Sequence, residues 1–470
     1  MGIFFTAGEK KVRPGLYNRY ENGSAKPIVA DGTVATVFAG NWGPLNTIKA
    51  LTQNDDISLI YGGTASEIID RTIAGGSGKI LAVRIGTGGT KGSVILKDTT
   101  ATPVNAITAT LKYEGDRALG YIIRDVLGDT ASRELIITES GTILEKITFA
   151  VSTTGEVDSL IAAAAKSIYV DLAKVDGYAG TGKLALVASG TFTGGVNPTV
   201  TTESYSNGFS LLETKNWDCV VVDTNDTAVH AILSGFVNRM YLLGRMGFAV
   251  IGEPSSVLYD TRLTHAVAYN DYNTIYVGMG YINAAGEKIE GWKAAANIAG
   301  LVAGIPSKKS ITHTVIADAV SLIETLTDTQ YQNAVRNGMI AFSVSSDDQV
   351  WVDSGITTLT VPSGEDDKGW EKIKRVKIRF EMMTRISNKT EKLSGQVDGT
   401  DDGKTTVIQI AQGVLNDMVA EKKLASGAKI ELVTDSSADP DSAYFNITAY
   451  DIDSLEKFYL VYKFRFSEAA

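Results

Sequence analysis

The chain has 470 residues, of which 44% are hydrophobic and 21% charged, so it is long enough for several globular domains. The formal net charge is −10, and the interspersed acidic and basic residues argue against a nucleic-acid-binding surface. Cys219 is the only cysteine, which excludes an intrachain disulfide. No apolar run approaches the roughly 20 residues of a membrane span, and the N-terminus lacks a signal-peptide pattern. We therefore expect a soluble protein that is made and kept in the cytosol.

The N-terminal region predicts an extended arm followed by an α/β unit. Residues 12–20 (V-R-P-G-L-Y-N-R-Y) suit an extended segment, which Pro14 restricts to an edge or a strand start. A β-branched strand is expected at 33–38, a helix at 65–73 and a buried strand at 79–85.

The pattern changes after a glycine-rich joint at 86–92. From residue 93 to about 200 the sequence consists mostly of short β runs, interrupted by one helix at 157–165. The β runs end at F-T-G-G-V-N-P, residues 192–198. This region is predicted to be a β-rich domain inserted into the α/β unit.

From Trp217 the α/β pattern resumes. A buried strand at 218–222, an amphipathic helix at 226–246 and a strand at 248–251 predict a parallel βαβ unit. Helices are also expected at 291–304, 315–326 and 328–337.

The last part predicts a small α+β domain. Basic residues in 368–379 (K-G-W-E-K-I-K-R-V-K-I-R) alternate with apolar ones, which predicts a strand with a basic face suited to an acidic partner surface. A helix at 405–424, capped by Gly427, would be covered by about three strands. Such a small sheet would have a free edge on each side.

The C-terminal stretch L-E-K-F-Y-L-V-Y-K-F-R-F, residues 455–466, carries the strongest strand signal of the chain. Its apolar face consists of Phe458, Leu460, Tyr462, Phe464 and Phe466. A strand this apolar must be paired, because an exposed hydrophobic edge invites association. It either closes the sheet of its own domain or completes the sheet of a neighbouring subunit.

A search for chemistry predicts no catalytic, cofactor-binding or metal site. The G-x-x-x-x-G-K match at 177–183 has Leu184 where a phosphate loop needs Ser or Thr. The loop V-D-G-T-D-D-G at 397–403 misses the spacing of a calcium loop. The histidines are far apart in sequence and match no metal-binding motif: His230, His265 and His313.

Eight stretches together resemble contractile phage tail sheath proteins of the type found in phages and tail-like particles of Gram-positive bacteria. They occur in the matching order at 15–22, 32–44, 192–205, 216–223, 245–251, 290–304, 327–338 and 369–380. The resemblance implies a structural subunit, with no enzymatic activity and no cofactor. Such subunits form a helical sleeve around an inner tail tube, then contract and drive the tube through the target envelope.

The resemblance also implies partners and a location. The partners would be further copies of the chain, the inner tube protein, and baseplate and tail terminator proteins, without direct nucleic-acid binding or membrane insertion. The protein would reside in a virion tail or tail-like particle assembled in the bacterial host cytoplasm. Residues implied in strand exchange between subunits are Val12, Leu16, Tyr17, Tyr20, Phe458, Leu460, Tyr462, Phe464 and Phe466. Tube-facing candidates are Glu421, Lys422 and Lys423.

The predicted fold is α/β and α+β multidomain, with a sheath core, an inserted β-rich domain and a C-terminal α+β domain completed by strands from neighbours. The predicted domains are an N-terminal arm at 1–27, the first part of the α/β domain at 28–92, the insertion at 93–203, the second part of the α/β domain at 204–360, the C-terminal α+β domain at 361–450 and an arm strand at 451–470. The alternative is an α/β enzyme or ligand-binding protein whose site has no recognisable motif. The sequence does not distinguish a phage tail from a bacteriocin particle.

Overall fold

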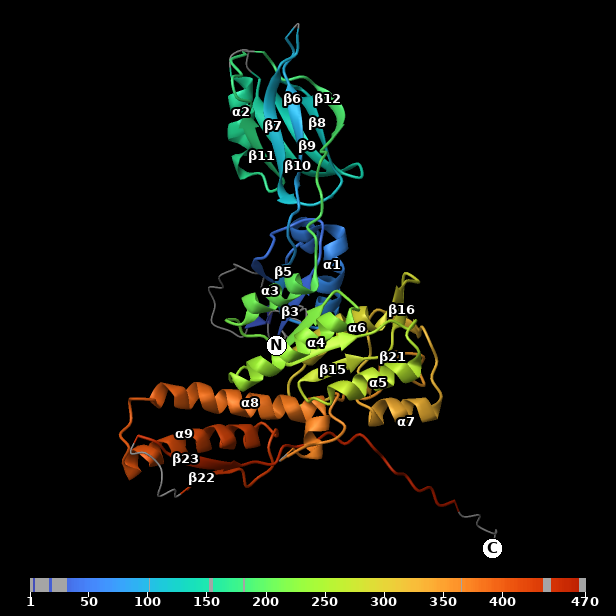
Figure 1. Cartoon of the computed structure of the whole chain (residues 1–470), viewed down its shortest axis with the longest axis vertical. Helices are drawn as coiled ribbons and strands as arrows, with labels where there is room; N and C mark the ends of the chain where they lie inside the picture. Colours follow the sequence, from blue (N-terminus) through green and yellow to red (C-terminus); the bar gives the residue numbers. More distant parts are fainter. Residues whose placement is uncertain are drawn as a thin grey trace.

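The computed structural model describes residues 3–4, 17–18, 32–100, 102–151, 155–180, 182–364, 366–433 and 441–464. Figure 1 shows a β-rich body at one end of the long axis, an α/β body in the middle and a smaller α+β body at the other end. The mixed α/β and α+β class predicted from the sequence is confirmed.

A seven-stranded sheet forms the α/β body. Its strands are β3 (Thr33–Phe38), β4 (Ile48–Leu51), β5 (Lys79–Arg84), β13 (Cys219–Val222), β14 (Phe248–Gly252), β15 (Thr274–Val277) and β19 (Met339–Ile340). Their order is β19-β15-β14-β13-β3-β5-β4, and only the β4–β5 pair is antiparallel. The inner strands are short apolar runs that are buried almost throughout, so both faces of the sheet must be covered.

Helices cover both faces of this sheet. They are α1 (Ile57–Gly75), α3 (Thr202–Leu212), α4 (Thr227–Leu242), α5 (Tyr259–Tyr269), α6 (Gly291–Gly304) and α7 (Asp328–Arg336). Tyr61 of α1 contacts Phe38, with ring centroids 5.1 Å apart. The neighbouring Val37 points to the other face, where it meets Gly208 of α3. The helices α1 and α3 therefore lie on opposite faces.

Small residues allow α6 to pack closely on α1. A Cβ atom added to Gly300 would lie 2.1 Å from the carbonyl oxygen of Thr72. Only glycine fits at this crossing. The remaining short strands beside this body are β16 (Tyr281–Asn283), β17 (Lys288–Ile289), β18 (Ala319–Leu322), β20 (Phe342–Val344) and β21 (Val350–Val352).

The β-rich body has its own hydrophobic core between two sheets, of order β10-β9-β8-β12 and β11-β7-β6. Its elements are β6 (Lys91–Lys97), β7 (Asn105–Glu114), β8 (Leu119–Val126), β9 (Asp129–Glu139), β10 (Thr142–Ala150), α2 (Glu156–Ala163), a 3-10 turn at Ala164–Lys166, β11 (Val170–Lys174) and β12 (Val187–Thr191). The chain enters and leaves this body side by side, through a bridge between Thr87 and Thr199. Because α3 begins at Thr202, the predicted boundary at 203 falls inside a helix of the α/β body; the domain limits stay predictions.

One aromatic side chain joins the β-rich and α/β bodies. Trp42 follows β3 in the sequence, yet it is only 1% exposed and belongs to the core of the β-rich body. Its ring lies between those of Tyr113 and Tyr169, and the guanidinium of Arg117 covers it. Arg84, fully buried, donates hydrogen bonds to three carbonyl oxygens at the same joint.

The C-terminal body consists of two helices and a two-stranded sheet. Its elements are α8 (Ile373–Thr390), α9 (Asp401–Ala420), β22 (Lys429–Val433), β23 (Tyr444–Thr448) and 3-10 turns at Lys368–Glu371 and Glu391–Leu393. Ile378 of α8 packs with Val414 and Leu415 of α9 in a separate core. Ile373 and Phe380 of α8 instead join the core of the α/β body. The helix α8 therefore connects the two bodies.

Three predictions about elements are wrong. The strand with a basic face predicted at 368–379 is a 3-10 turn followed by the start of helix α8. The helix predicted at 315–326 contains the strand β18, which pairs with β16. About three strands were expected over the C-terminal helix, and among the described residues two are found, β22 and β23. The C-terminal helix itself is confirmed, but it ends at Ala420 with Glu421 as its C-cap, so the predicted cap at Gly427 is wrong as well.

Candidate functional site

The C-terminal arm, residues 455–464, leaves the C-terminal body as an extended segment without secondary structure (Figure 1). Its side chains on both faces are exposed, reaching 93% for Phe464. The described part of the arm does not close a sheet of its own chain, so the in-domain alternative finds no support there. The most exposed apolar side chains are Leu455, Phe458, Tyr459, Leu460, Val461, Tyr462 and Phe464. Phe466 lies outside the described residues.

The sheet of β22 and β23 offers edges to which such an arm can add. The two strands pair antiparallel from Lys429 with Thr448 to Val433 with Tyr444. Ile430 and Phe445 contact the α9 core, so one face of the sheet is covered. Within the described part of the chain neither strand has a second strand partner. The backbone N–H of Ile430 in β22 donates to the side-chain oxygen of Gln412 in α9, which caps one group of the β22 edge. An unpaired edge of this kind is a template for another strand.

The root of the arm is anchored by charge. Asp451 forms ion pairs with Arg375 and Arg379 of α8. Burial alone would raise the pKa of Asp451, but the hydrogen bonds from both guanidinium groups outweigh it and hold the pKa below its usual value. The basic face predicted around 368–379 therefore exists on a helix, and it binds acidic residues of the same chain. Sequence reasoning missed these acids, although D-I-D-S-L-E at 451–456 is a visible acidic run.

The three tube-facing candidates differ in accessibility. Lys423 is only 8% exposed, and its ammonium pairs with Glu381 and Glu421. Hydrogen bonds from Arg385 and Lys423 lower the pKa of Glu421 to about 2. Lys422 is exposed and adopts a positive φ of 60°. Of the three, Lys422 is therefore free to meet a partner through its charge.

The N-terminal candidates lie mostly outside the described residues. This holds for Val12, Leu16 and Tyr20. The short strand β2 (Tyr17–Asn18) pairs in parallel with β1 (Ile3–Phe4), so Tyr17 lies opposite Ile3 of the same chain.

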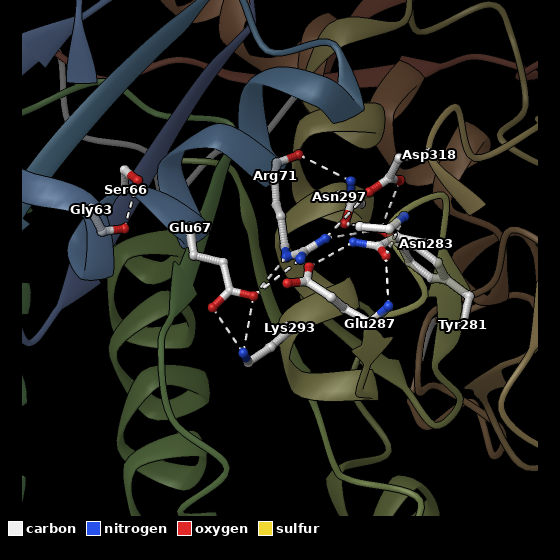
Figure 2. Close-up of polar contacts among 11 residues, drawn as sticks. Gly63, Ser66, Glu67, Arg71, Tyr281, Asn283, Glu287, Lys293, Asn297 and Asp318 are labelled. Atoms are coloured by element: carbon white, nitrogen blue, oxygen red, sulfur yellow. Dashed lines mark hydrogen bonds and ion pairs between the residues drawn. The ribbon is translucent and has the colours of Figure 1, made fainter. Parts of the chain in front are cut away.

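A polar cleft lies where an α/β protein would hold a ligand, at the carboxyl ends of β3 and β13. Glu67, Arg71 and Lys293 line it, and Figure 2 shows them turned toward one another. The carboxylate of Glu67 accepts hydrogen bonds from both cations, at 3.0 Å and 2.8 Å. Arg71 also reaches Asp318, whose other oxygen accepts a hydrogen bond from Tyr281. These charges satisfy one another and tie α1, α6 and the strand β16 together.

The remaining chemical candidates are dispersed. Cys219 is fully buried in β13, and burial raises the pKa of its thiol. The histidines do not meet: His230 is buried in α4 against the carbonyl of Thr224, His265 pairs with Glu253, and His313 stacks on Trp351. In the described ranges no group of three potential metal ligands comes together. No helix in those ranges has the length and apolar character needed to cross a membrane.

Comparison with known proteins gives one family and a set of similar folds. Residues 199–358 match the phage tail sheath protein central domain. No curated protein sequence matches the chain. The sheath tail protein of Desulfitobacterium hafniense is 20% identical with a TM-score of 0.74, covering 93% of this chain and 98% of that one. The sheath tail protein of Listeria innocua is 17% identical with a TM-score of 0.64, covering 90% and 95%.

A more distant similarity extends to a contracted particle. The helical sheath of the anti-feeding prophage, solved in its contracted state, is 10% identical with a TM-score of 0.53, covering 97% of this chain and 99% of that one. The three bodies of this chain thus occur together, over nearly the full length, in solved sheath proteins.

Proposed function

From the premise that this chain carries a phage tail sheath central domain within the fold of sheath proteins, we propose that it is a structural subunit of a contractile tail sheath. Subunits polymerise into a helical sleeve around an inner tube, and contraction of the sleeve drives the tube through a target envelope. The observation that carries this proposal is the exposed apolar arm beside a sheet with open edges. Each subunit has both halves of a repeating contact.

We propose that the C-terminal arm of one subunit adds a strand to the β22–β23 sheet of a neighbouring subunit. The N-terminal arms of subunits would likewise add strands to sheets of their neighbours. Burying the five apolar side chains of one arm face contributes about 7–15 kcal/mol. Ordering about 10 residues costs about 10–20 kcal/mol, and each ladder hydrogen bond returns about 0.5–1.5 kcal/mol. These terms nearly cancel for a single arm. Polymerisation should therefore be cooperative and start from a nucleus such as a baseplate.

We propose the inner tube protein and the tail terminator as further partners, in a virion tail or tail-like particle. The tube contact would lie on the outward face of α9 and at Lys422, because Glu421 and Lys423 are already paired within the subunit. Charged contacts of this kind set register more than affinity. Lys422→Glu should impair copolymerisation with the tube and leave sleeves of the chain alone intact, as seen by electron microscopy. Unchanged tube binding would place the contact elsewhere.

The arm is tested by removing residues 458–470. Because the apolar side chains in the described part of this segment are at least 70% exposed, the shortened chain should keep the Tm of the full chain and remain monomeric. Phe464→Asp should have the same effect, while Lys463→Asp, on the opposite face, should still polymerise. Electron microscopy and sedimentation distinguish sleeves from monomers. Sleeves formed by Phe464→Asp would contradict strand exchange.

We infer that the chain is not an enzyme, and the paired charges in the cleft of Figure 2 support this. A ligand that binds the folded state raises the Tm, by an amount that grows with the logarithm of its concentration relative to its Kd. Nucleotides and divalent metals should therefore leave the Tm unchanged. A reproducible increase with one of them would favour the alternative of a ligand-binding α/β protein.

A further inference from the structure

The arm root, residues 451–456, is held in two different ways along its length. At its start, the backbone N–H of Ile452 donates to the carbonyl of Lys423, and Asp451 bridges to Leu424. Beyond Ile452, in the described part of the chain, no backbone hydrogen bond to another element holds the root. Side chains alone fix residues 453–456.

Helix α8 and its N-cap residue, Lys372, supply the basic partners for these side chains. The ammonium of Lys372 lies 2.8 Å from a carboxylate oxygen of Asp453 and 2.9 Å from one of Glu456. Burial opposes the charge of Lys372, but its hydrogen bonds to both carboxylates outweigh it and raise the pKa. Lys374 donates to the hydroxyl of Ser454, 3.1 Å away. One face of the root is thus fastened to α8.

Glu456 also reaches the α/β body. Its Oε2 accepts from Lys372, while its Oε1 lies 3.2 Å from the hydroxyls of both Ser310 and Thr312. These two residues belong to the loop between α6 and β18. A single carboxylate therefore joins three parts: the arm, helix α8 and the α/β body.

Glu456 is also the last fixed point before the free segment. Its side chain is 19% exposed, whereas Leu455 and Phe458 beside it are more than two thirds exposed. From Lys457 to Phe464, side chains make no hydrogen bond or ion pair with the described rest of the chain. The contacts of Glu456 therefore determine where the arm leaves the subunit.

We propose that Glu456 is a positioning residue that fixes the point and direction of departure of the C-terminal arm. It does so through the contacts of its carboxylate with Lys372, Ser310 and Thr312, here called the clip. The inference deepens the proposed function, because a directed arm samples the edge of its neighbour at a higher effective concentration than a free one. It also lowers the ordering cost of docking. The Lys372–Glu456 pair is partly buried, and salt screens such pairs less than exposed ones, so arm direction should depend only weakly on ionic strength.

The test measures the arm in the full-length monomer, before any assembly. Cys219 is fully buried, so cysteines introduced by Ala420→Cys and Leu460→Cys can be labelled selectively with nitroxides. The parent pair should give a narrow distance distribution at low salt. Glu456→Gln should broaden it about twofold. Raising salt from about 0.01 M to about 1 M, which shortens the Debye length from about 30 Å to about 3 Å, should broaden it by less, because the ion pair is partly buried.

A matched control variant and a double-mutant cycle show whether the effect is specific to Glu456. Glu391→Gln is the same isosteric change at an exposed carboxylate without a side-chain partner among the described residues, and it should leave the distribution narrow. Lys372→Gln combined with Glu456→Gln should broaden the distribution by less than the sum of the two single effects, because both substitutions remove the Lys372–Glu456 contact. An equal Tm for all variants shows that the fold is intact.

Two results would overturn the inference: a parent distribution that is already broad at low salt, or a Glu456→Gln distribution as narrow as the parent. Sleeve assembly is scored separately. If the full chain never forms sleeves, the proposed function fails, while the distance measurement still decides the role of Glu456.

Discussion

Trp42 follows the α/β strand β3 in the sequence but packs in the core of the β-rich body. Its replacement by Ala would remove a side chain that is 1% exposed, stacked on Tyr169 and in edge-to-face contact with Tyr113. We expect a loss of about 3–5 kcal/mol in the local unfolding free energy. Hydrogen exchange of amides in β7 and β11 would measure it. Leu127→Ala, at a fully exposed leucine, should change the same amides by less than about 0.5 kcal/mol.

The carboxylates of the arm root predict a response to acid. The pKa of Asp451 is lowered in the folded subunit, so its contribution is present above the unfolded value near 3.8 and is lost as pH falls through the lower folded value. Glu421, with a pKa of about 2, loses its pairs only at the acidic end of that window. The nitroxide distance distribution should therefore be constant from pH 7 to about pH 5 and broaden below about pH 4. Broadening that begins near pH 6 would implicate a histidine instead.

At the scale of elements, helix α8 explains the largest error of the sequence analysis. Ile373 and Phe380 pack in the α/β core, whereas Ile378 packs in the C-terminal core. A helix with apolar residues on two sides produces an alternation that resembles a strand. By contrast, strands β3, β5, β13 and β14 were predicted correctly, because short continuous apolar runs bounded by turns are typical of strands buried on both faces.

Nonlocal contacts account for the other element errors and for the missed part of the site. β18 pairs with β16 nearly forty residues away, which outweighs the helical spacing of its own segment. The arm was predicted as an apolar strand from its alternation alone. The clip at Glu456 was not predicted. It depends on contacts between the arm root, the N-terminus of α8 and the loop at 310–312, which are far apart in sequence and leave no local pattern.

The C-terminal body offers a matched pair of leucines. Leu415 of α9 is fully buried in its core, whereas Leu432 of β22 is 39% exposed. Leu415→Ala should destabilise this body by about 2–5 kcal/mol, measured by hydrogen exchange of α9 amides. Leu432→Ala should have a much smaller effect on these amides but should weaken polymerisation if the exposed side of the sheet contacts a neighbour. Equal destabilisation by both would contradict a separate, small core.

At the scale of the whole molecule, the β-rich body is expected to be dispensable for assembly. Excision of residues 91–195, with the ends joined by glycines, keeps the bridge between Thr87 and Thr199 and all of α3. Because Trp42 would lose its pocket, Trp42→Ser should accompany the excision. We expect a folded chain that forms thinner sleeves under the electron microscope. Soluble, folded monomers that never polymerise would show that the insertion takes part in the sleeve.

The position of the insertion has a consequence for how the protein is made. Strand β3 pairs with β13 across 185 residues, so at about 5–20 residues per second the ribosome needs about 9–37 s to supply the second strand. Until then β3 and β5 expose an apolar edge.

Folding of the insertion brings Thr87 and Thr199 together and shortens the loop that β13 must close. An insertion that misfolds leaves this loop long and the edge open. A damaged insertion should therefore reduce the yield of soluble chain more than no insertion at all.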